Sequence, residues 1–376
     1  VEEVLSSPPG AEAQIIGMKD NRVTRTPLVQ CVEETHKVAE LENAGDFDGA
    51  LALRGRRFEN NLRTLRTIIR ALPRPATPGQ KRLRIAIVHS GGPAPGMNTA
   101  VRASLRLALD QGHHVIGVRN GFRGFVDGDF QEMEGMRDTG WPSRGGAELG
   151  TNRKVPADRE LYTLARHIEQ EGIDAVLMIG GWSGYQAVYK LRSERERFPA
   201  FDIPMICLPA SINNNLPGSE QSIGSDSALN NIVVAVDKIK QSAVASKRCF
   251  VVEVMGRRCG YLALLSGLAT GAERVYMHEE GVTLADLQRD LSAMAEGFKQ
   301  GKRLGLVVRA EEANPLYTTP FMYALFEQEG GELFDVRQAI LGHLQQGGDP
   351  SPFDRILATR FASECVDYLV KEAESP

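Results

Sequence analysis

The sequence predicts an α/β protein with two Rossmann-like subdomains, each with a mainly parallel sheet, a cleft between them and a helical connector in front. Three observations support this fold class. From residue 83 onward, apolar runs typical of buried strands alternate with glycine-rich turns and helices, as in a doubly wound parallel sheet. The alternation starts again after Ser225, which indicates a second sheet. A proline- and glycine-rich segment, 73–79, separates this region from helical sequence before it.

The first 80 residues are expected to form the connector. Residues 1–26 are polar and irregular, whereas 27–42 carry a helical stripe of apolar side chains. A second helix is expected over 47–72. It is rich in arginine, which we interpret as a solvated helix face rather than a ligand site.

The elements after the linker follow in order. The strands expected in the first subdomain are 85–88, 114–118, 174–179 and 204–208, with a helix over 97–109. The elements expected in the second are the helices 226–246, 284–299 and 315–327 and the strands 250–254, 305–309 and 339–341. A closing helix is expected over 353–370. We therefore divide the chain into 1–80, 81–224 together with about 345–376, and 225–344.

Length, charge and cysteine usage narrow the class of function. A chain of 376 residues is long enough for two cores, because single cores stop growing near 250–300 residues. The net charge of -4 gives no indication of a nucleic-acid or membrane partner, and no apolar run approaches the ~20 residues of a membrane span. The start of the chain does not resemble a secretory signal. Five cysteines without CxxC spacing indicate free thiols in a reducing compartment and no zinc site.

One polar pentapeptide is the most informative stretch of the chain. Ser211-Ile212-Asn213-Asn214-Asn215 follows the predicted strand 204–208. Polar residues at the carboxyl end of such a strand lie where open α/β sheets bind ligands. The glycine turns 91–96 and 180–184 follow two other strands and could hold phosphate, although tight strand–helix turns explain them equally well. A dinucleotide site is not expected, because GxGxxG is absent from the first turn.

Several charged residues near predicted strand ends suit an anionic sugar. They are Arg153, Arg248, Arg257, Glu311, Arg337 and His343. Arginine binds phosphate bidentately, and glutamate or histidine can hydrogen-bond sugar hydroxyls. Any one of them alone is typical of a surface charge, but together they favour a sugar bisphosphate.

From Ile85 to about Val370 the chain resembles the 6-phosphofructokinases. The motifs that carry the resemblance are Leu149-Gly-Thr-Asn-Arg153, the run 208–220, Val254-Met-Gly-Arg257 and the run 336–348. The effector or sugar-phosphate residues that the resemblance implies are Arg153, Ser211, Ile212, Asn213, Asn214, Asn215, Arg248, Met255, Gly256, Arg257, Glu311, Arg337, His343, Leu344, Gln345 and Gln346. Arg248 and Arg337 would reach across a subunit interface, which implies a homo-oligomer, a tetramer or larger.

The catalytic motifs of the family are altered in this sequence. Asn213 occupies the position of the catalytic aspartate, and Asn215 that of a second acid. Trp182 stands where a magnesium-binding aspartate is expected, and Pro93 interrupts the first loop. An amide cannot accept a proton at neutral pH, so a rate loss of roughly 10²–10⁴ is expected. We therefore expect no catalytic residue and no metal site here, and degenerate nucleotide loops formed by Gly91, Gly92, Gly180, Gly181 and Trp182.

This pattern resembles the C-terminal, regulatory half of the eukaryotic ATP-dependent enzymes. The resemblance implies that the activator fructose 2,6-bisphosphate binds in a former sugar-phosphate site. The glycolytic reaction, ATP with fructose 6-phosphate giving ADP and fructose 1,6-bisphosphate, would use Mg-ATP in the catalytic N-terminal half of the same cytoplasmic polypeptide. Residues 1–45 would be the tail of that half, and the helix containing 52–58 would be the connector.

Two other hypotheses remain open at this point. The chain could be a competent sugar-phosphate kinase with an unusual base, such as Asp226 or Glu220. It could also be a structural half that binds nothing and braces its catalytic partner. The retained arginines argue against a purely structural role, because clustered like charges repel one another.

Overall fold

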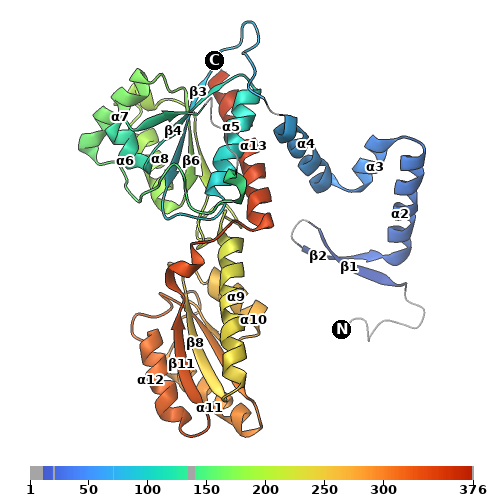
Figure 1. Cartoon of the computed structure of the whole chain (residues 1–376), viewed down its shortest axis with the longest axis vertical. Helices are drawn as coiled ribbons and strands as arrows, with labels where there is room; N and C mark the ends of the chain where they lie inside the picture. The colour runs from blue at the N-terminus through green and yellow to red at the C-terminus, as the bar shows by residue number, and fades with distance from the viewer. Residues whose placement is uncertain (1–11, 20–21, 71, 134–139, 375–376) are drawn as a thin grey trace. The chain divides into compact units, whose positions relative to one another are not determined.

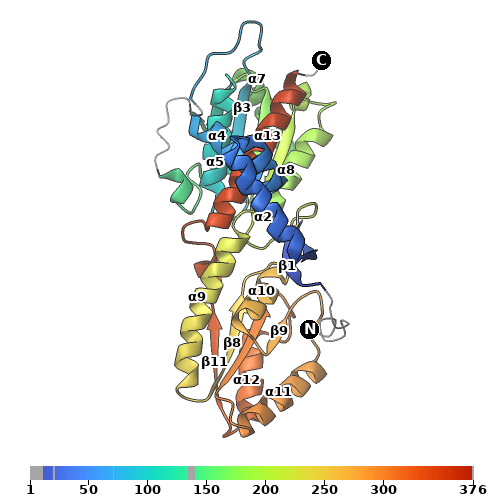
Figure 2. The ribbon, with the colours of Figure 1, turned by 90° about the vertical axis from the view of Figure 1, so that its right-hand side faces the viewer.

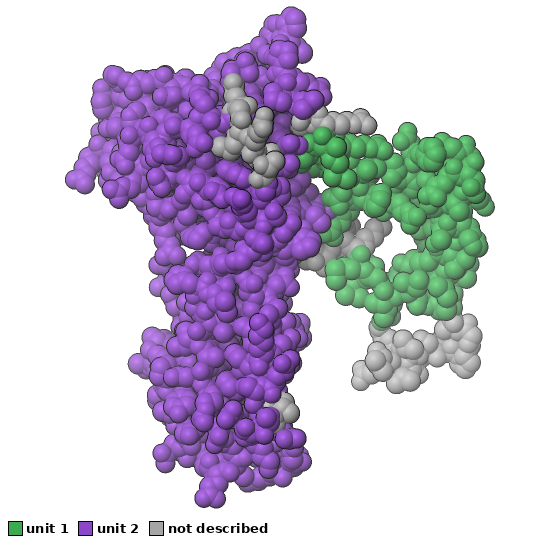
Figure 3. Space-filling model, in the orientation of Figure 1, with its two compact units in different colours: residues 1–70 green, residues 71–376 purple. Residues whose placement is uncertain are grey.

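The computed structural model describes residues 12–19, 22–70, 72–133 and 140–374. The chain divides into two compact units, residues 1–70 and 71–376, which Figure 3 colours separately. Within the described ranges, no helix is both long and apolar enough to cross a membrane.

Unit 1 contains a hairpin and three helices. Strands β1 (Gln14–Lys19) and β2 (Arg22–Pro27) pair antiparallel, with Met18 opposite Val23. The prediction of irregular structure up to residue 26 was therefore wrong for this hairpin. Its apolar residues do not alternate, because Ile15 and Ile16 are adjacent in β1 and Val23 is the one aliphatic residue of β2.

Three helices follow where the sequence predicted two. They are α2 (Leu28–Asn43), α3 (Phe47–Leu53) and α4 (Arg56–Arg70). The Asp46 side chain accepts a 2.9 Å hydrogen bond from the Gly49 amide and so caps α3. The predicted helix 47–72 breaks at Gly55, whose φ of 89° lies in the left-handed region that glycine adopts readily.

The first sheet of unit 2 has the order β5-β4-β3-β6-β7. Its strands are β3 (Arg84–Ser90), β4 (His114–Val118), β5 (Phe130–Glu132), β6 (Ala175–Gly180) and β7 (Met205–Pro209). All pairings are parallel except that of β4 with β5. The four predicted strands of this subdomain are all present.

Helices cover both faces of this sheet (Figures 1 and 2). On one face, α6 (Gly121–Asp127), α7 (Asp158–Gln170) and α8 (Trp182–Ser193) share a core with alternate strand residues such as Ala86 and Val88. On the other face α5 (Met97–Asp110) packs against the last helix, α13 (Pro352–Glu374). The end of the chain thus returns to the first sheet.

The second sheet has the order β11-β8-β10-β9 and is parallel throughout. Its strands are β8 (Arg248–Val254), β9 (Arg274–Tyr276), β10 (Leu304–Ala310) and β11 (Asp335–Ile340). Its helices are α9 (Ser225–Val244), α10 (Tyr261–Thr270), α11 (Leu284–Lys299) and α12 (Thr319–Gly330). Helix α12 begins four residues later than predicted, because the Asn314 side chain accepts from the Leu316 and Tyr317 amides and holds a turn there.

A buried carboxylate links the start of α9 to the start of α13, the two places where the chain crosses between the sheets. Asp354 of α13 accepts hydrogen bonds from the Gly224 amide at 2.9 Å and the Ser227 amide at 2.8 Å, at the start of α9. Burial raises the pKa of this carboxyl group, while these donors act in the opposite direction.

The predicted fold class is confirmed: the protein is α/β with mainly parallel sheets. The sequence did not predict α6, β5, α7, α10 or β9. Two of these are three-residue strands, too short to show a period. The three-part division of the chain stays a prediction.

Candidate functional site

Three loops meet because three parallel strands end at one edge of the first sheet. Ser90 of β3 pairs with Gly180 of β6, which pairs with Pro209 of β7. The chain segments that follow are the two glycine turns and the amide pentapeptide. Parallel register therefore brings together residues more than 100 positions apart.

The two glycine turns touch through their backbones. Gly91 has a φ of 112°, and a Cβ built on it would lie 3.2 Å from the Gly181 nitrogen. The Gly91 amide donates to the Asn152 carbonyl at 2.8 Å, and the Gly181 amide donates to the Ser90 carbonyl at 3.0 Å. Gly91 is thus required by its backbone geometry and its close approach to Gly181, whatever the turns bind, whereas a Cβ on Gly181 would make only ordinary contacts.

The central asparagine of the pentapeptide has a structural role. Asn214 adopts a φ of 51°, and its side-chain oxygen accepts from the Ser222 amide at 2.7 Å while its nitrogen donates to the Glu220 carbonyl at 2.8 Å. These bonds close the loop 211–222. Asn214 does not line the pocket described below.

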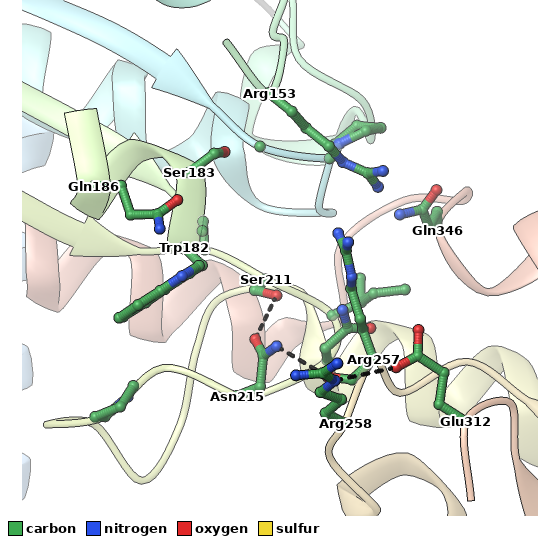
Figure 4. Close-up of a pocket in the computed structure, with 18 residues that line it drawn as sticks. Arg153, Trp182, Ser183, Gln186, Ser211, Asn215, Arg257, Arg258, Glu312 and Gln346 are labelled. Atoms are coloured by element: carbon green, nitrogen blue, oxygen red, sulfur yellow. Dashed lines mark hydrogen bonds and ion pairs between the residues drawn. The ribbon is translucent and has the colours of Figure 1, made fainter. Parts of the chain in front are cut away.

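The neighbouring asparagines face the pocket. The Asn213 Oδ1 atom is buried and accepts no hydrogen bond from any group that the structure describes. The Asn215 Nδ2 atom donates to the Arg257 carbonyl at 3.3 Å, which links the first-sheet loop to a turn after β8. Figure 4 shows Asn215 between Ser211 and the arginine pair.

Residues from both sheets enclose one pocket of about 880 Å³. At one end lie Arg153, Arg257, Arg258 and Gln346, which we call the arginine end. At the other lie Gly91, Gly181, Trp182, Ser183 and Gln186, which we call the tryptophan end. In Figure 4 the labelled residues of the two groups occupy opposite sides of the view, with Ser211 and Asn215 between them. The remaining lining residues are Gly92, Pro93, Ala210, Ser211, Ile212, Asn213, Asn215, Pro217 and Glu312.

At the arginine end, two side-chain donors converge over Gly92. A Cβ built on Gly92 would lie 3.5 Å from an Arg153 guanidinium nitrogen and 3.1 Å from the Gln346 amide nitrogen. The absence of a side chain at this position lets both donors point into one space, as Figure 4 shows. Converging nitrogens of this kind suit an anionic oxygen group.

The charge of the pocket is positive. Three arginines line it, and Glu312 is the one acidic residue among the described lining residues. Its carboxylate lies 3.8 Å from the Arg258 Nε atom. No group of three or more histidine, cysteine or acidic side chains within the described ranges could hold a metal ion. This donor set does not fit a magnesium ion, which requires carboxylate oxygens.

Four residues that the sequence predicted for the site do not line the pocket but fix the backbone beside the lining residue Arg257. The buried Gln345 accepts from the Met255 amide at 3.0 Å, and Glu311 accepts from the Gly256 amide at 3.4 Å. Burial raises the pKa of Glu311, and the nearby charges of Glu312 and Glu253 raise it further. Met255, Gly256, Glu311 and Gln345 do not line the pocket.

His343 and Leu344 are exposed on the short helix η3 (Gly342–Gln345) and lie outside the lining. The His343 Nδ1 atom lies 2.8 Å from the Gln346 side-chain oxygen, so this histidine can orient a lining residue. Gly180 also lies outside, at the end of β6.

Arg248 and Arg337 are not brought to the pocket. Arg248 begins β8, whereas the turn carrying Arg257 follows the opposite end of the same strand. Arg337 lies on β11, at the edge of the sheet, and both arginines are near Asp335, at 3.9 Å and 3.7 Å. Their predicted role across a subunit interface stays a prediction.

Sequence reasoning did not single out Ser183, Gln186, Arg258 or Glu312 as pocket residues. Ser183 and Gln186 are on the first turn of α8, so their place after a glycine turn was a usable signal. Arg258 and Glu312 each follow a residue that was predicted, but nothing in the local sequence indicates which of two adjacent charges faces a cavity.

The fold is that of a known protein family. Residues 84–369 match the protein family described as Phosphofructokinase. The ATP-dependent 6-phosphofructokinase of Dictyostelium discoideum is 45% identical over 94% of this chain and 42% of its own length. The platelet-type enzyme of Oryctolagus cuniculus is 40% identical over 99% of this chain and 47% of its own length.

Two solved structures agree closely with this one. The Pichia pastoris phosphofructokinase in the T-state matches with a TM-score of 0.93 at 36% identity, over 99% of this chain and 43% of that one. The Saccharomyces cerevisiae enzyme matches with a TM-score of 0.94 at 35% identity, over 99% of this chain and 50% of that one. The chain belongs to the phosphofructokinase family. It spans about half the length of the curated relatives it matches, which is consistent with one half of a eukaryotic ATP-dependent 6-phosphofructokinase.

Proposed function

We propose that this chain is the regulatory half of a eukaryotic-type ATP-dependent 6-phosphofructokinase and binds fructose 2,6-bisphosphate in the pocket without transferring phosphate itself. The observation that carries the proposal is the asymmetry of the pocket. Three arginines line it, whereas the positions at which the family resemblance predicts acids hold Asn213, Asn215 and Trp182. A site with cationic donors and no acid at these positions can bind a sugar bisphosphate but lacks the groups that the family pattern uses for phosphoryl transfer.

The competing kinase hypothesis needs a base that reaches the pocket. Asp226 is engaged elsewhere, because its carboxylate accepts from Ser351 Oγ at 2.5 Å and from Asn230 Nδ2 at 3.1 Å. Glu220 does not line the pocket. Glu312 does, but it lies beside Arg258 at the arginine end. We infer that none of these three groups acts as a catalytic base.

The partners follow from the family. We infer that the catalytic half precedes this chain in one cytoplasmic polypeptide and uses Mg-ATP there. We also infer a homo-oligomer of at least four subunits in which Arg248 and Arg337 contact a neighbouring copy. The exposed edge strand β11 and the place of both arginines outside the pocket support that arrangement. The three-part division of the chain is retained in this proposal, because each sheet carries its own helices.

Regulation requires that the effector bind two conformations with different affinity. A bisphosphate that draws Arg153 and Arg257 together from opposite walls would stabilise the arrangement in which the two sheets are closest. That arrangement is the one we assign to the active state of the parent enzyme.

Calorimetric titration of the 376-residue chain with fructose 2,6-bisphosphate, and with fructose 6-phosphate for comparison, tests the proposal. We expect tighter binding of the bisphosphate and no turnover of fructose 6-phosphate with Mg-ATP. Phosphorylation by this chain would overturn the regulatory assignment. A folded chain that binds neither sugar would instead support the bracing hypothesis.

A further inference from the structure

Arg258 lies on the wall of the pocket in a backbone conformation that only a few per cent of non-glycine residues adopt. Its φ is 53°. The turn around it is held on both sides. The Asn215 side chain donates to the Arg257 carbonyl at 3.3 Å, and the Gly260 amide donates to both Glu279 oxygens, at 2.8 and 3.0 Å. The structure therefore maintains an uncommon conformation that directs one more guanidinium toward the pocket.

The turn carrying Glu312 is fixed in the same way. The Glu311 amide donates to the Val254 carbonyl at 2.9 Å, and the Ala313 amide donates to the Ala310 carbonyl at 3.0 Å. The His278 Nδ1 atom lies 3.3 Å from the Glu312 carbonyl oxygen. Both partners of the ion pair thus project from rigid turns, after β8 and β10 of the second sheet.

The ion pair itself is weak. The Arg258 Nε atom is 3.8 Å from the Glu312 carboxylate, beyond hydrogen-bond distance, and the two side chains are 80% and 46% exposed. Exposed pairs of this kind contribute little to stability. A phosphate dianion offers the guanidinium shorter, charge-assisted hydrogen bonds. An anionic ligand can therefore displace the carboxylate.

We propose that Arg258 is a further anion-binding residue of this pocket and that Glu312 competes with the ligand for it. This inference rests on the proposed function, because it assumes that a sugar bisphosphate occupies the pocket. Arg153 and Arg257 hold, beside Gln346, the phosphate that the bisphosphate has and fructose 6-phosphate lacks. Arg258, the next residue after Arg257, leaves Glu312 and binds the same phosphate, so it sets the preference for a bisphosphate over a monophosphate.

Calorimetry on four forms of the 376-residue chain tests this: wild type, Arg258→Ala, Glu312→Gln and the double variant. For Arg258→Ala we expect an affinity for fructose 2,6-bisphosphate lower by about tenfold, the size of one charge-assisted hydrogen bond. The affinity for fructose 6-phosphate should change much less. For Glu312→Gln we expect tighter bisphosphate binding by about threefold, because the variant removes a carboxylate that forms only a weak, exposed ion pair with Arg258. In the double variant that gain should vanish, because the competitor acts only through Arg258.

The matched control is Arg289→Ala, which removes an exposed arginine of the same sheet region, paired with Asp286 at 2.7 Å, away from the pocket. It should leave both affinities unchanged. If Glu312→Gln strengthens binding equally with and without Arg258, or if Arg258→Ala binds the bisphosphate like wild type, the inference is wrong while the proposed function stands. If the wild-type chain binds neither sugar, the proposed function fails and this inference with it.

Discussion

The two ends of the pocket are built alike and differ in chemistry. Each includes a turn that follows a parallel strand, and each has a glycine at a point of close approach, Gly91 at one end and Gly92 at the other. The arginine end carries three guanidinium groups, whereas the tryptophan end carries uncharged side chains where the family resemblance predicts a metal-binding acid. The backbone of a site can thus be preserved by packing alone, while the retention of charge indicates a ligand. Substitutions at either end of the pocket test that distinction.

The tryptophan end should be intolerant of change in its backbone even though we assign it no ligand. A Cβ on Gly180 would lie 1.8 Å from the Ser90 carbonyl oxygen, so Gly180→Ala must displace β3 or β6. We expect a loss of about 3 kcal/mol or more in the free energy of unfolding, at the upper end of overpacking effects. Urea denaturation measures it. Gly347→Ala, at a glycine with open space around it, is the control and should be nearly neutral. A neutral Gly180→Ala would show that packing does not preserve this end.

His89 is buried near the end of β3, just before the glycine turn of the tryptophan end, and should make the free energy of unfolding depend on pH. Burial lowers the pKa of His89 to about 4, partly offset by the nearby backbone of Gly150, although neither ring nitrogen has a hydrogen-bond partner among the described residues. In the unfolded chain the pKa is near 6.5, so between these values only the unfolded state binds the proton. Stability from this group is complete above about pH 6.5 and is lost as the pH falls toward 4, by about 3 kcal/mol.

Denaturation of wild type and His89→Gln at pH 7 and pH 4.5 tests this prediction. The wild-type chain should lose more stability between the two pH values than the variant. Equal losses would assign the pH dependence to carboxylates whose pKa is lowered in the folded chain, such as Glu160 and Asp286.

At the arginine end, Arg153→Ala should weaken fructose 2,6-bisphosphate binding by about 30- to 100-fold. Hydrogen bonds to charged groups are worth about 1.5–3 kcal/mol each, and this guanidinium converges with Gln346 over Gly92. Calorimetry measures the change, and Arg123→Ala, an exposed arginine paired with Asp127, is the control. Binding that survives intact would remove the contrast between the two ends.

Between the ends, Asn213→Asp should reduce bisphosphate affinity by about tenfold and should not create a kinase. A carboxylate about 6 Å from a phosphate costs about 1–3 kcal/mol per unit charge at the effective dielectric of a protein surface. Phosphoryl transfer should stay undetected in a coupled assay, because Trp182 and Pro93 still leave the nucleotide side without acids. Asn213→Ala serves as the neutral control. Turnover in Asn213→Asp would show that the tryptophan end still binds nucleotide productively.

The sequence alone determined the succession of strands and helices along the chain and the chemical character of the site. Apolar strand runs, glycine turns and helix stripes are local signals, and they predicted twelve of the described strands and helices of unit 2, from β3 to α13, to within four residues at each end. The amides at 213 and 215 and the indole at 182 are identities, so no structure is needed to see that acids are missing. The hairpin β1–β2 has no such local signal and was not predicted.

Tertiary structure decided which of these residues face the pocket. Adjacent residues such as Glu311 and Glu312, or Gln345 and Gln346, have the same charge or side chain, yet one supports a backbone amide and the other lines the cavity. Arg248 looked equivalent to Arg257 in sequence but lies at the opposite end of β8. The reason is geometric: the direction of a side chain depends on φ and ψ at its own turn and on the strand register that places that turn, and neither is encoded in the identity of the residue.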